Sequence, residues 1–452
     1  LLFFVVRLYG ITNPPIDPAS TWRQCDVLMI ARNFYEIDSN IFYPRVDLGG
    51  KDGSIVGVEF PIYNYTIYLV SSVFGYQDWY GRIINLVLVT LSLLLLHKVL
   101  MWYLSEEAAF YATMVFLFSG WFAYSRITIP DVFAGSLCII SLYFAFAYFR
   151  TGRIVFLLVF TAIAALGSLS KITAAPILTV LLAPMLDHRV AIARKFALVG
   201  SAVVILALVI AWYFYWVPHL NSIGMGGYFF MGAPIKEALA QLLEQPGAYL
   251  LEIYEAPLKY IGGTLFVISI LLAIRQHKGT VVAVLCLPFL VFCLLLLKIG
   301  NAFLINGYYF LLLVPSMAMV VGYGISLLQN RKVQLAVIIL IAVENVGNQI
   351  HIFQVRPAYQ SYPGLEKIFD RLGGSDELVA IGNEGSPMAR YFCHRKGLNY
   401  RLDFFQNPEN IASLRQNGFT YVLIIKRETG FENVNLEFPV VYDSGEFKVY
   451  KL

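Results

Sequence analysis

Charged residues are scarce in this chain. Asp, Glu, Lys and Arg make up 14% of its 452 residues, whereas a soluble domain carries about 25%. Hydrophobic residues make up 58%, and they gather in apolar stretches of about 20 residues, the length that crosses a bilayer. The scarcity therefore excludes an ordinary soluble protein and predicts a polytopic α-helical membrane protein.

Cysteine is also rare, and its placement argues against a disulfide framework. Three of the five cysteines lie in apolar stretches, where we expect small core residues. Only Cys25 and Cys393 fall in polar regions. The sequence contains neither a clustered His and Cys set suited to a metal nor a basic patch suited to nucleic acid.

Eleven apolar segments predict a membrane domain over residues 1–355. They cover about 1–10, 80–102, 105–125, 131–149, 154–170, 172–187, 196–217, 258–275, 279–297, 308–328 and 333–352. The first is too short to span, so we expect a truncated helix there. Basic residues gather at alternate turns, which by the positive-inside rule face the cytoplasm. They are Lys98, Arg150, Arg153, Arg189, Arg194, Lys195, Arg275, Lys278, Arg331 and Lys332.

Two long loops, about 11–79 and 218–257, then lie on the outer side. Within the first loop, residues 22–38 and 59–75 predict two helices lying on the membrane surface. The second loop contains a glycine-rich run at 224–227 and an amphipathic stretch at 235–254. This combination suggests a flexible lid.

The composition from about residue 356 changes to that of a soluble α/β domain, which we assign to 356–452 on the outer side. Strands are predicted at 377–382, 421–425 and 447–450, and helices at 364–372 and 408–417. The run 382–385 is a weak signal for a phosphate-binding loop and is more often a turn.

Charged residues at the outer membrane boundary are the candidates for chemistry. Each also has a structural explanation: an ion pair, a lysine or arginine that reaches the headgroups, a helix-dipole charge, or an aromatic belt. Together they supply cations that could hold a phosphate and carboxylates that could take a proton from a hydroxyl. The motifs are Trp22-Arg23-Gln24-Cys25-Asp26, Glu59-Phe60-Pro61-Ile62-Tyr63-Asn64-Tyr65 and Ser125-Arg126-Ile127-Thr128-Ile129-Pro130-Asp131, joined by Arg82, Lys171, Tyr308 and Tyr309.

In the order of these motifs the chain resembles the GT-C fold glycosyltransferases that use lipid-linked sugars. It is most similar to the branch holding the protein O-mannosyltransferases and the lipid A aminoarabinose transferases. The resemblance covers about residues 11–330 and rests on an acid in the first outer loop, a Glu-x-Pro stretch, an Arg…Asp turn and a later Lys. Phe60 stands where a lysine is common, which leaves the phosphate ligands open.

The resemblance implies an inverting transfer of a sugar from a polyprenyl-phosphate donor to a hydroxyl. Asp26 would be the general base, with Asp17 as the alternative, and Asp131 and Glu59 would complete the catalytic acids. No cofactor is required; a divalent cation, if one is used, would be held by Asp26, Glu59 and Asp131. The residues expected at the donor and its phosphate are Arg82, Arg126, Lys171, Arg23, Tyr63 and Tyr309.

The expected location is a bacterial inner membrane, with the site facing the periplasm. The acceptor would be a cell-envelope glycan such as lipopolysaccharide, a lipid or a protein. Two alternatives remain at this stage. One is a glycan polymerase or ligase, although the second outer loop has Lys236 as its only basic residue. The other is a transporter or flippase of lipid-linked sugars, which often shows internal repeats that we do not find.

Overall fold

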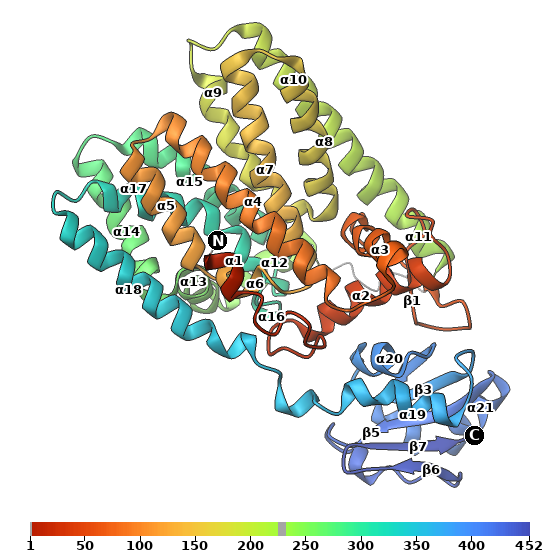
Figure 1. The fold of residues 1–452 in the computed structure, drawn as a ribbon. Helices are drawn as coiled ribbons and strands as arrows, with labels where there is room; N and C mark the ends of the chain where they lie inside the picture. Colours follow the sequence, from red (N-terminus) through yellow and green to blue (C-terminus); the bar gives the residue numbers. More distant parts are fainter. Residues whose placement is uncertain (1, 225–231) are drawn as a thin grey trace. The chain divides into compact units, whose positions relative to one another are not determined.

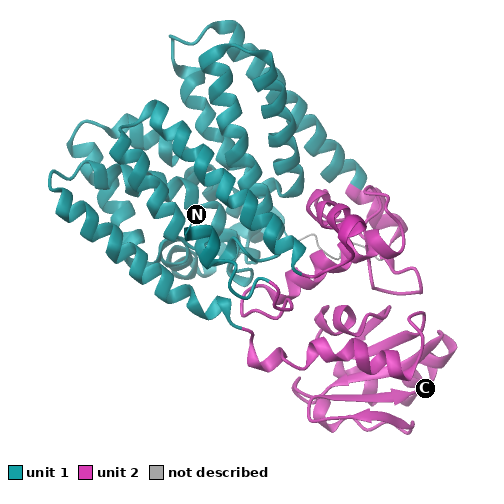
Figure 2. Ribbon diagram, viewed as in Figure 1, with its two compact units in different colours: residues 1–11, 79–216, 230–354 teal, residues 12–78, 217–229, 355–452 magenta. Residues whose placement is uncertain are grey.

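The computed structural model describes residues 2–224 and 232–452, so the glycine-rich lid prediction lies largely outside the described residues. The chain divides into two compact units (Figure 2). Unit 1 comprises Leu1–Ile11, Trp79–Trp216 and Phe230–Gln354, and unit 2 comprises Thr12–Asp78, Val217–Phe229 and Val355–Leu452. The C-terminal segment thus forms one unit with the first outer loop. The assignment of 1–355 and 356–452 as two domains stays a prediction.

Unit 1 is helical (Figure 1). Its α-helices are α1 (Leu2–Val6), α4 (Tyr80–Tyr103), α5 (Glu106–Phe118), α6 (Trp121–Tyr124), α7 (Pro130–Thr151), α8 (Ile154–Ser170), α9 (Leu182–Leu186), α10 (Ile192–Ile210), α12 (Ile235–Glu244), α13 (Pro246–Glu255), α14 (Lys259–Arg275), α15 (Gly279–Ile299), α16 (Ala302–Ile305), α17 (Val314–Ser326) and α18 (Arg331–Gln349). Its other helical turns are η1 (Ile172–Leu181), η2 (Ala211–Trp216), η3 (Tyr309–Leu312) and η4 (Ile350–Phe353).

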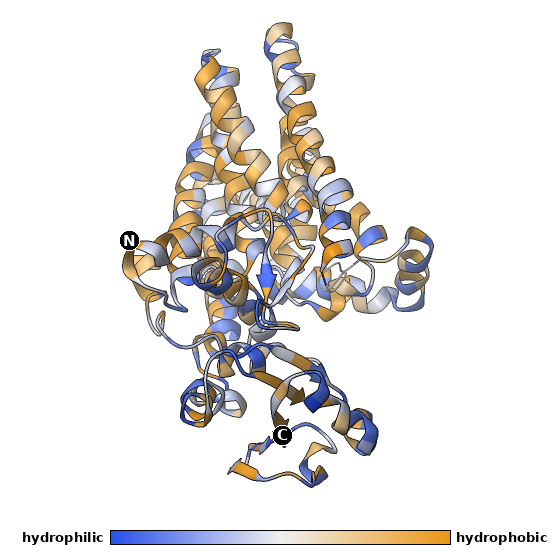
Figure 3. Ribbon diagram, turned by 90° about the vertical axis from the view of Figure 1, so that its right-hand side faces the viewer, coloured by the Kyte–Doolittle hydropathy of each residue, from blue (hydrophilic) through white to orange (hydrophobic). Residues whose placement is uncertain are grey.

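Five helices within the described residues are long and apolar enough to cross a membrane, and a sixth results if the bent pair α13 and α14 is one span. Shorter apolar helices lie at 154–170, 172–186 and 314–326, within or close to three further predicted spans. In Figure 3 the helices of this unit are mainly hydrophobic along their length. A polytopic α-helical membrane protein is confirmed, while the number of crossings stays a prediction.

Local sequence explains where these helices begin and end. Ser105 accepts a hydrogen bond from the backbone N–H of Ala108 at 3.2 Å and so caps α5. Helix α7 begins at Pro130, whose missing N–H is not needed in the first turn. It ends at Gly152, which has a φ of 73° and can adopt this left-handed conformation at little cost.

Close helix packing in unit 1 depends on small residues. Helix α7 packs against α4 and α8, and α5 packs against α17. At the second contact, a Cβ added to Gly322 would lie 2.1 Å from the backbone N of Ala112. Such close backbone approach is typical of helix pairs in membranes, where small residues replace the hydrophobic effect as the source of tight packing.

Unit 2 contains the predicted α/β fold. Its strands are β1 (Arg45–Val46), β2 (Ser54–Ile55), β3 (Leu378–Gly382), β4 (Gly397–Tyr400), β5 (Phe419–Ile425), β6 (Val440–Asp443) and β7 (Phe447–Lys451). Its helices are α2 (Thr21–Glu36), α3 (Ile62–Phe74), α11 (Val217–Ile223), α19 (Leu365–Leu372), α20 (Met388–Cys393) and α21 (Pro408–Gln416), with short turns η5 (Pro357–Tyr359), η6 (Tyr362–Gly364), η7 (Leu402–Gln406) and η8 (Phe431–Asn433).

The five-stranded sheet has the order β4-β3-β5-β7-β6. Strand β3 pairs in parallel with β4 and β5, whereas β7 pairs antiparallel with β5 and β6. One buried cluster, which includes Val422, Ile424 and Leu414, packs beneath the sheet. The small C-terminal α/β domain is thereby confirmed.

The two surface helices predicted in the first outer loop correspond to α2 and α3. Helix α2 differs from the expectation of an amphipathic helix, because every residue from Gln24 to Phe34 is buried. It packs against α3, β1 and α20. A helix covered by protein on several sides can hold polar side chains away from water, which bears on the carboxylate it carries.

Candidate active site

The start of α2 is fixed by Asp17. The Gln24 side chain donates to a carboxylate oxygen of Asp17 at 3.2 Å, and the Thr21 hydroxyl donates to the Asp17 carbonyl at 2.6 Å. Ser20 precedes the helix with a φ of 55°, a region that few residues other than glycine adopt. Asp17, the alternative base, therefore lies where it orders the first turn of α2.

Asp26 lies one turn further along α2 and is 8% exposed. Among the described residues, its Oδ1 has no hydrogen-bond partner. Burial raises the pKa of Asp26 to about 7, and the positive charges of Arg23 and Arg390 offset only part of this effect. A carboxyl group whose pKa lies near neutral pH can accept a proton and release it again, as a general base must.

Arg23 and Glu59 form an ion pair beside this carboxylate. Glu59 lies just before α3, whose Asn64 side chain donates to the Val27 carbonyl of α2 at 2.8 Å. Tyr63 is buried in the same first turn of α3. Unit 2 thus brings together three predicted site residues, Asp26, Arg23 and Glu59. The sequence alone left open that Glu59 only pairs with a nearby basic residue, and the structure contains such an ion pair.

In unit 1, two predicted phosphate ligands converge on one carbonyl. Arg126 donates to the Gly10 carbonyl at 2.6 Å, and Arg82 approaches the same oxygen at 3.5 Å. The turn that carries Arg126 is held by Asn85, which donates to the carbonyls of Ile127 and Ile129 at 2.8 and 3.1 Å. Arg82 and Arg126 are both fully buried, so two guanidinium groups are held close together away from solvent.

Asp131 and Lys171 form a second pair in unit 1. The Lys171 Nζ lies 3.7 Å from Asp131 Oδ2, and it also lies 5.2 Å from the centre of the Tyr309 ring. Lys171 follows the last residue of α8, and Asp131 lies in the first turn of α7. The fold of unit 1 therefore brings the predicted Arg…Asp turn to the predicted lysine.

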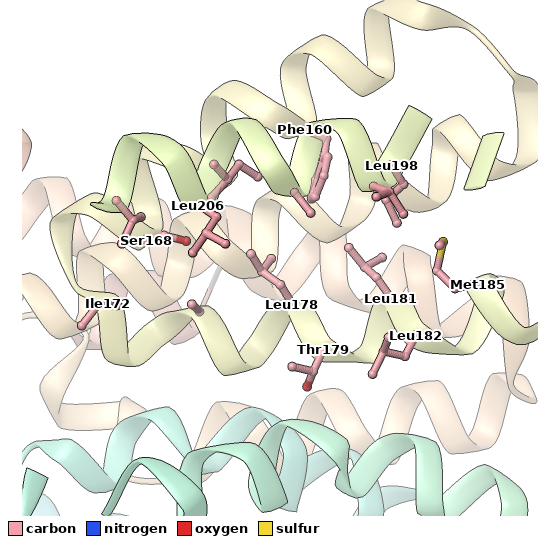
Figure 4. Close-up of a pocket in the computed structure, with 15 residues that line it drawn as sticks. Phe160, Ser168, Ile172, Leu178, Thr179, Leu181, Leu182, Met185, Leu198 and Leu206 are labelled. Carbon is pink, nitrogen blue, oxygen red and sulfur yellow. The ribbon is translucent and has the colours of Figure 1, made fainter. Parts of the chain in front are cut away.

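An apolar cavity of about 400 Å³ lies between α8, η1, α9 and α10. In Figure 4, Phe160 and Leu206 point toward Leu178 and Leu181 across the cavity, whereas Thr179 and Leu182 point the other way. Ser168 and Thr179 are the polar residues among those that line it, and Ile172, the neighbour of Lys171 in sequence, also lines it. Such a cavity can hold a hydrocarbon chain.

No group of three or more His, Cys, Asp or Glu side chains within the described residues could hold a metal ion. The predicted alternative set divides between the units, because Asp131 belongs to unit 1 while Asp26 and Glu59 belong to unit 2. Metal dependence stays a prediction, as does the role of each residue assigned from the sequence.

Sequence analysis missed the C-terminal residues that surround α2. Arg390 acts electrostatically on Asp26, and Lys396 binds Asp47 of the first outer loop at 2.7 Å. Helix α20, which carries Arg390, is only six residues long and gives no periodic signal. The one available sign is the clustering of Arg390, His394, Arg395 and Lys396 within an otherwise weakly charged chain.

Comparison with known proteins supports the predicted fold. Residues 59–216 match the family described as dolichyl-phosphate-mannose-protein mannosyltransferase. A crystal structure of ArnT from Cupriavidus metallidurans bound to undecaprenyl phosphate aligns with a TM-score of 0.67 and 12% identity, covering 100% of this chain and 97% of ArnT. The chain has the GT-C fold.

A second GT-C relative is the oligosaccharyltransferase AglB from Archaeoglobus fulgidus, solved with an inhibitory peptide and a dolichol-phosphate. It aligns with a TM-score of 0.52 and 10% identity, covering 94% of this chain and 69% of AglB. No curated protein sequence matches this chain. This chain is therefore a multi-pass membrane protein with the fold of ArnT.

Proposed function

We propose that this chain is an inverting glycosyltransferase that uses a polyprenyl-phosphate sugar as donor. The observation that carries the proposal is Asp26, a buried carboxylate with a pKa raised to about 7 on the first helix of the outer loop. The likeness to ArnT and AglB, which were solved with undecaprenyl phosphate and dolichol-phosphate, supports a lipid phosphate as the carrier.

In the proposed reaction, Asp26 takes the proton of the acceptor hydroxyl. The hydroxyl oxygen then attacks the anomeric carbon and forms the new glycosidic bond. The bond from that carbon to the phosphate oxygen breaks on the opposite side, which inverts the anomeric centre. The lipid phosphate leaves with the bonding electron pair, and protonated Asp26 later releases its proton to water.

The donor phosphate is assigned to the cations of unit 1. Arg82 and Arg126 converge on one carbonyl, and arginine binds phosphate oxygens through paired N–H groups. Lys171 is the neighbour in sequence of Ile172, which lines the cavity. A donor whose phosphate binds Lys171 could therefore place its polyprenyl chain in the cavity. Because these cations neutralise the leaving group, the reaction needs no metal.

We assign the remaining predicted residues to supporting roles in the same reaction. Arg23 and Glu59 are proposed to orient the groups around Asp26, with Tyr63 packed beside them. Asp131 is proposed to orient Lys171, and Tyr309 to lie against the donor. The acceptor is a cell-envelope glycan, a lipid or a protein, and the proposed location is a bacterial inner membrane with the site facing the periplasm.

Sugar transfer is tested with the full chain in liposomes, a panel of radiolabelled polyprenyl-phosphate sugars and Asp26→Asn beside the wild type. Of these two proteins, only the wild type should move label out of the lipid fraction, and its rate should rise with pH through a midpoint at about pH 7, the pKa of Asp26. Asp52→Asn, an exposed acid of the same loop, serves as the matched control and should keep full activity.

The other outcomes discriminate among the alternatives. Activity in both wild type and Asp26→Asn would move the base to Asp17, Glu59 or Asp131. Binding of donors without transfer by any protein would favour a transporter or flippase. Transfer of longer lipid-linked glycans alone would favour a polymerase or ligase.

A further inference from the structure

The first outer loop adds to the edge of the C-terminal sheet within unit 2. Leu48 pairs in parallel with Gly397, the first residue of edge strand β4. The N–H of Gly49 donates to the Gly397 carbonyl, and the N–H of Gly397 donates to the Asp47 carbonyl, both at 3.0 Å. On its other side, a Cβ on Gly397 would lie 1.8 Å from the carbonyl oxygen of Val379 in β3, so only glycine lets β4 lie this close to β3 at the residue that receives the loop.

A buried charge cluster lies beside this pairing. The Asp47 carboxylate, which is fully buried, accepts hydrogen bonds from Arg32 at 2.8 Å, Asn33 at 2.9 Å and Lys396 at 2.7 Å. Arg32 and Asn33 belong to α2, whereas Lys396 precedes β4. Because buried charges require close partners, the cluster fixes α2 and the C-terminal sheet in one arrangement.

Helix α20 of the C-terminal segment packs directly on α2. The Arg32 guanidinium donates to the Tyr391 carbonyl at 3.1 Å and lies 4.7 Å from the centre of its ring. The Tyr391 hydroxyl bonds to Asp78 and lies 3.1 Å from the hydroxyl of Tyr76, which itself donates to the Leu28 carbonyl of α2. These contacts hold α20, which also carries Arg390, against α2.

We propose that the C-terminal α/β domain completes the candidate active site by supplying Arg390 as a positioning residue for Asp26. Arg390 is 1% exposed, and its guanidinium interacts electrostatically with the Asp26 carboxylate. The domain therefore does more than cover the membrane part, because it sets the charge beside the base. The proposal rests on the proposed function of Asp26.

Loss of Arg390 should change the pKa of Asp26. Burial raises its pKa, and Arg390 is one of two cations that oppose the rise. Removing Arg390 should raise the pKa further, since an opposite charge nearby shifts a carboxyl pKa by about 1 to 3 units. The other titratable or charged groups next to Asp26 or on elements packed against α2 are Arg23, Cys25, Glu59, Tyr63, Tyr65, Tyr68, Arg45, Tyr391 and Cys393.

The test is the pH profile of kcat for Arg390→Gln in the full chain. We expect its midpoint to rise by about 1 pH unit or more. The rate at pH 7 should then fall about fivefold, while the plateau at high pH is retained. Arg390→Lys keeps the charge and should keep the wild-type midpoint. Arg401→Gln, an exposed arginine of the same domain, is the matched control.

Infrared titration of the Asp26 carboxyl band, assigned by its loss in Asp26→Asn, measures the same shift without any activity. A wild type that transfers no sugar would refute the proposed function, whereas the infrared shift would still support Arg390. An unchanged midpoint in Arg390→Gln, or a rate lowered equally at every pH, would overturn the positioning role. If Arg390→Gln does not fold, Arg390→Met replaces it, because its unbranched apolar stem preserves packing.

Discussion

Replacing Asp47 by Asn should loosen the C-terminal sheet from α2. Asp47 is fully buried and balances Arg32 and Lys396. Burial alone would raise its pKa, but these two cations and the hydrogen bonds from Lys396 and Asn33 lower the pKa to about 2. An asparagine amide carries no charge, so both cations would remain buried without their counterion.

The magnitude follows from two estimates. Lowering the Asp47 pKa from 3.8 to about 2 corresponds to about 2 kcal/mol, at 1.36 kcal/mol per pKa unit. Removing one partner of a buried charge pair costs about 3 to 5 kcal/mol, because the remaining charges stay desolvated. The free energy of local opening should therefore fall by about 2 to 5 kcal/mol, which speeds exchange by about 30-fold or more.

Hydrogen exchange of the full chain measures this opening directly. The reporter amides are those of Gly49 and Gly397, which join the first outer loop to β4. Asp370→Asn is the matched control, since Asp370 pairs with Arg395 in the same domain but its side chain is 58% exposed. The Arg395 guanidinium is buried but also donates to the carbonyls of His394 and Gly373, both at 3.1 Å. Loss of the exposed carboxylate should therefore cost about 1 kcal/mol at most and leave both amides protected.

The pH dependence of the Asp47 contribution has a defined sign. Because the pKa in the folded state is below the unfolded value, the contribution is fully present above about pH 4 and is lost as pH falls toward 2. Protection of the reporter amides should fall across this window in the wild type and much less in Asp47→Asn. Equal protection of the two proteins at neutral pH would refute the argument for Asp47.

Three further predictions concern other contacts. Burial lowers the pKa of His394, but hydrogen bonds to Glu36 and Glu366 outweigh this effect, and the net pKa is raised. The ion pairs of His394 with these two glutamates should therefore stabilise the fold below about pH 6.5 and weaken as pH rises through the folded pKa. His394→Gln should lower the stability of unit 2 by about 1 kcal/mol at most at pH 6 and by less at pH 9, as measured by proteolysis. Gly322→Ala should destabilise the α5–α17 contact by about 1 to 3 kcal/mol in detergent unfolding, whereas Gly347→Ala, with open space around it, should not. Lys171→Met should raise the KM for the donor at least tenfold, because Lys171 is the cation paired with Asp131; an unchanged KM would remove Lys171 from donor binding.

Much of the fold was predictable because it depends on local patterns. Strands β3 and β5 are mainly apolar runs, β7 alternates apolar residues with lysine, and all three fall where the sequence predicts them. Strands β4 and β6 were missed, since each has four residues and β6 is largely exposed at the edge of the sheet. Short edge strands carry little hydrophobic signal, because they are defined by their neighbours rather than by their own composition.

The candidate site was predictable only in part, for the same reason. Asp26 could be found because an acid next to Arg23 stands out in an apolar chain. Helix α20, which carries Arg390, packs on α2, a helix more than 350 residues earlier in the chain. No local pattern encodes that contact, nor the one between Asp47 and Lys396, which lie 349 residues apart in sequence.

The first outer loop contains acids that look alike in sequence but differ in their surroundings. Asp47 is surrounded by two cations, and its pKa falls to about 2, whereas Asp26 keeps a pKa near 7 because burial outweighs its two cations. Carboxyl groups whose environments move their pKa values apart can take different roles in one protein. Loss of activity alone would not separate them, since it does not distinguish a missing base from a loosened α2. Hydrogen exchange at the Gly397 amide separates the two roles. Asp26→Asn should leave the protection of Gly397 intact or increase it, because neutralising a buried carboxylate relieves its desolvation. Asp47→Asn should remove that protection.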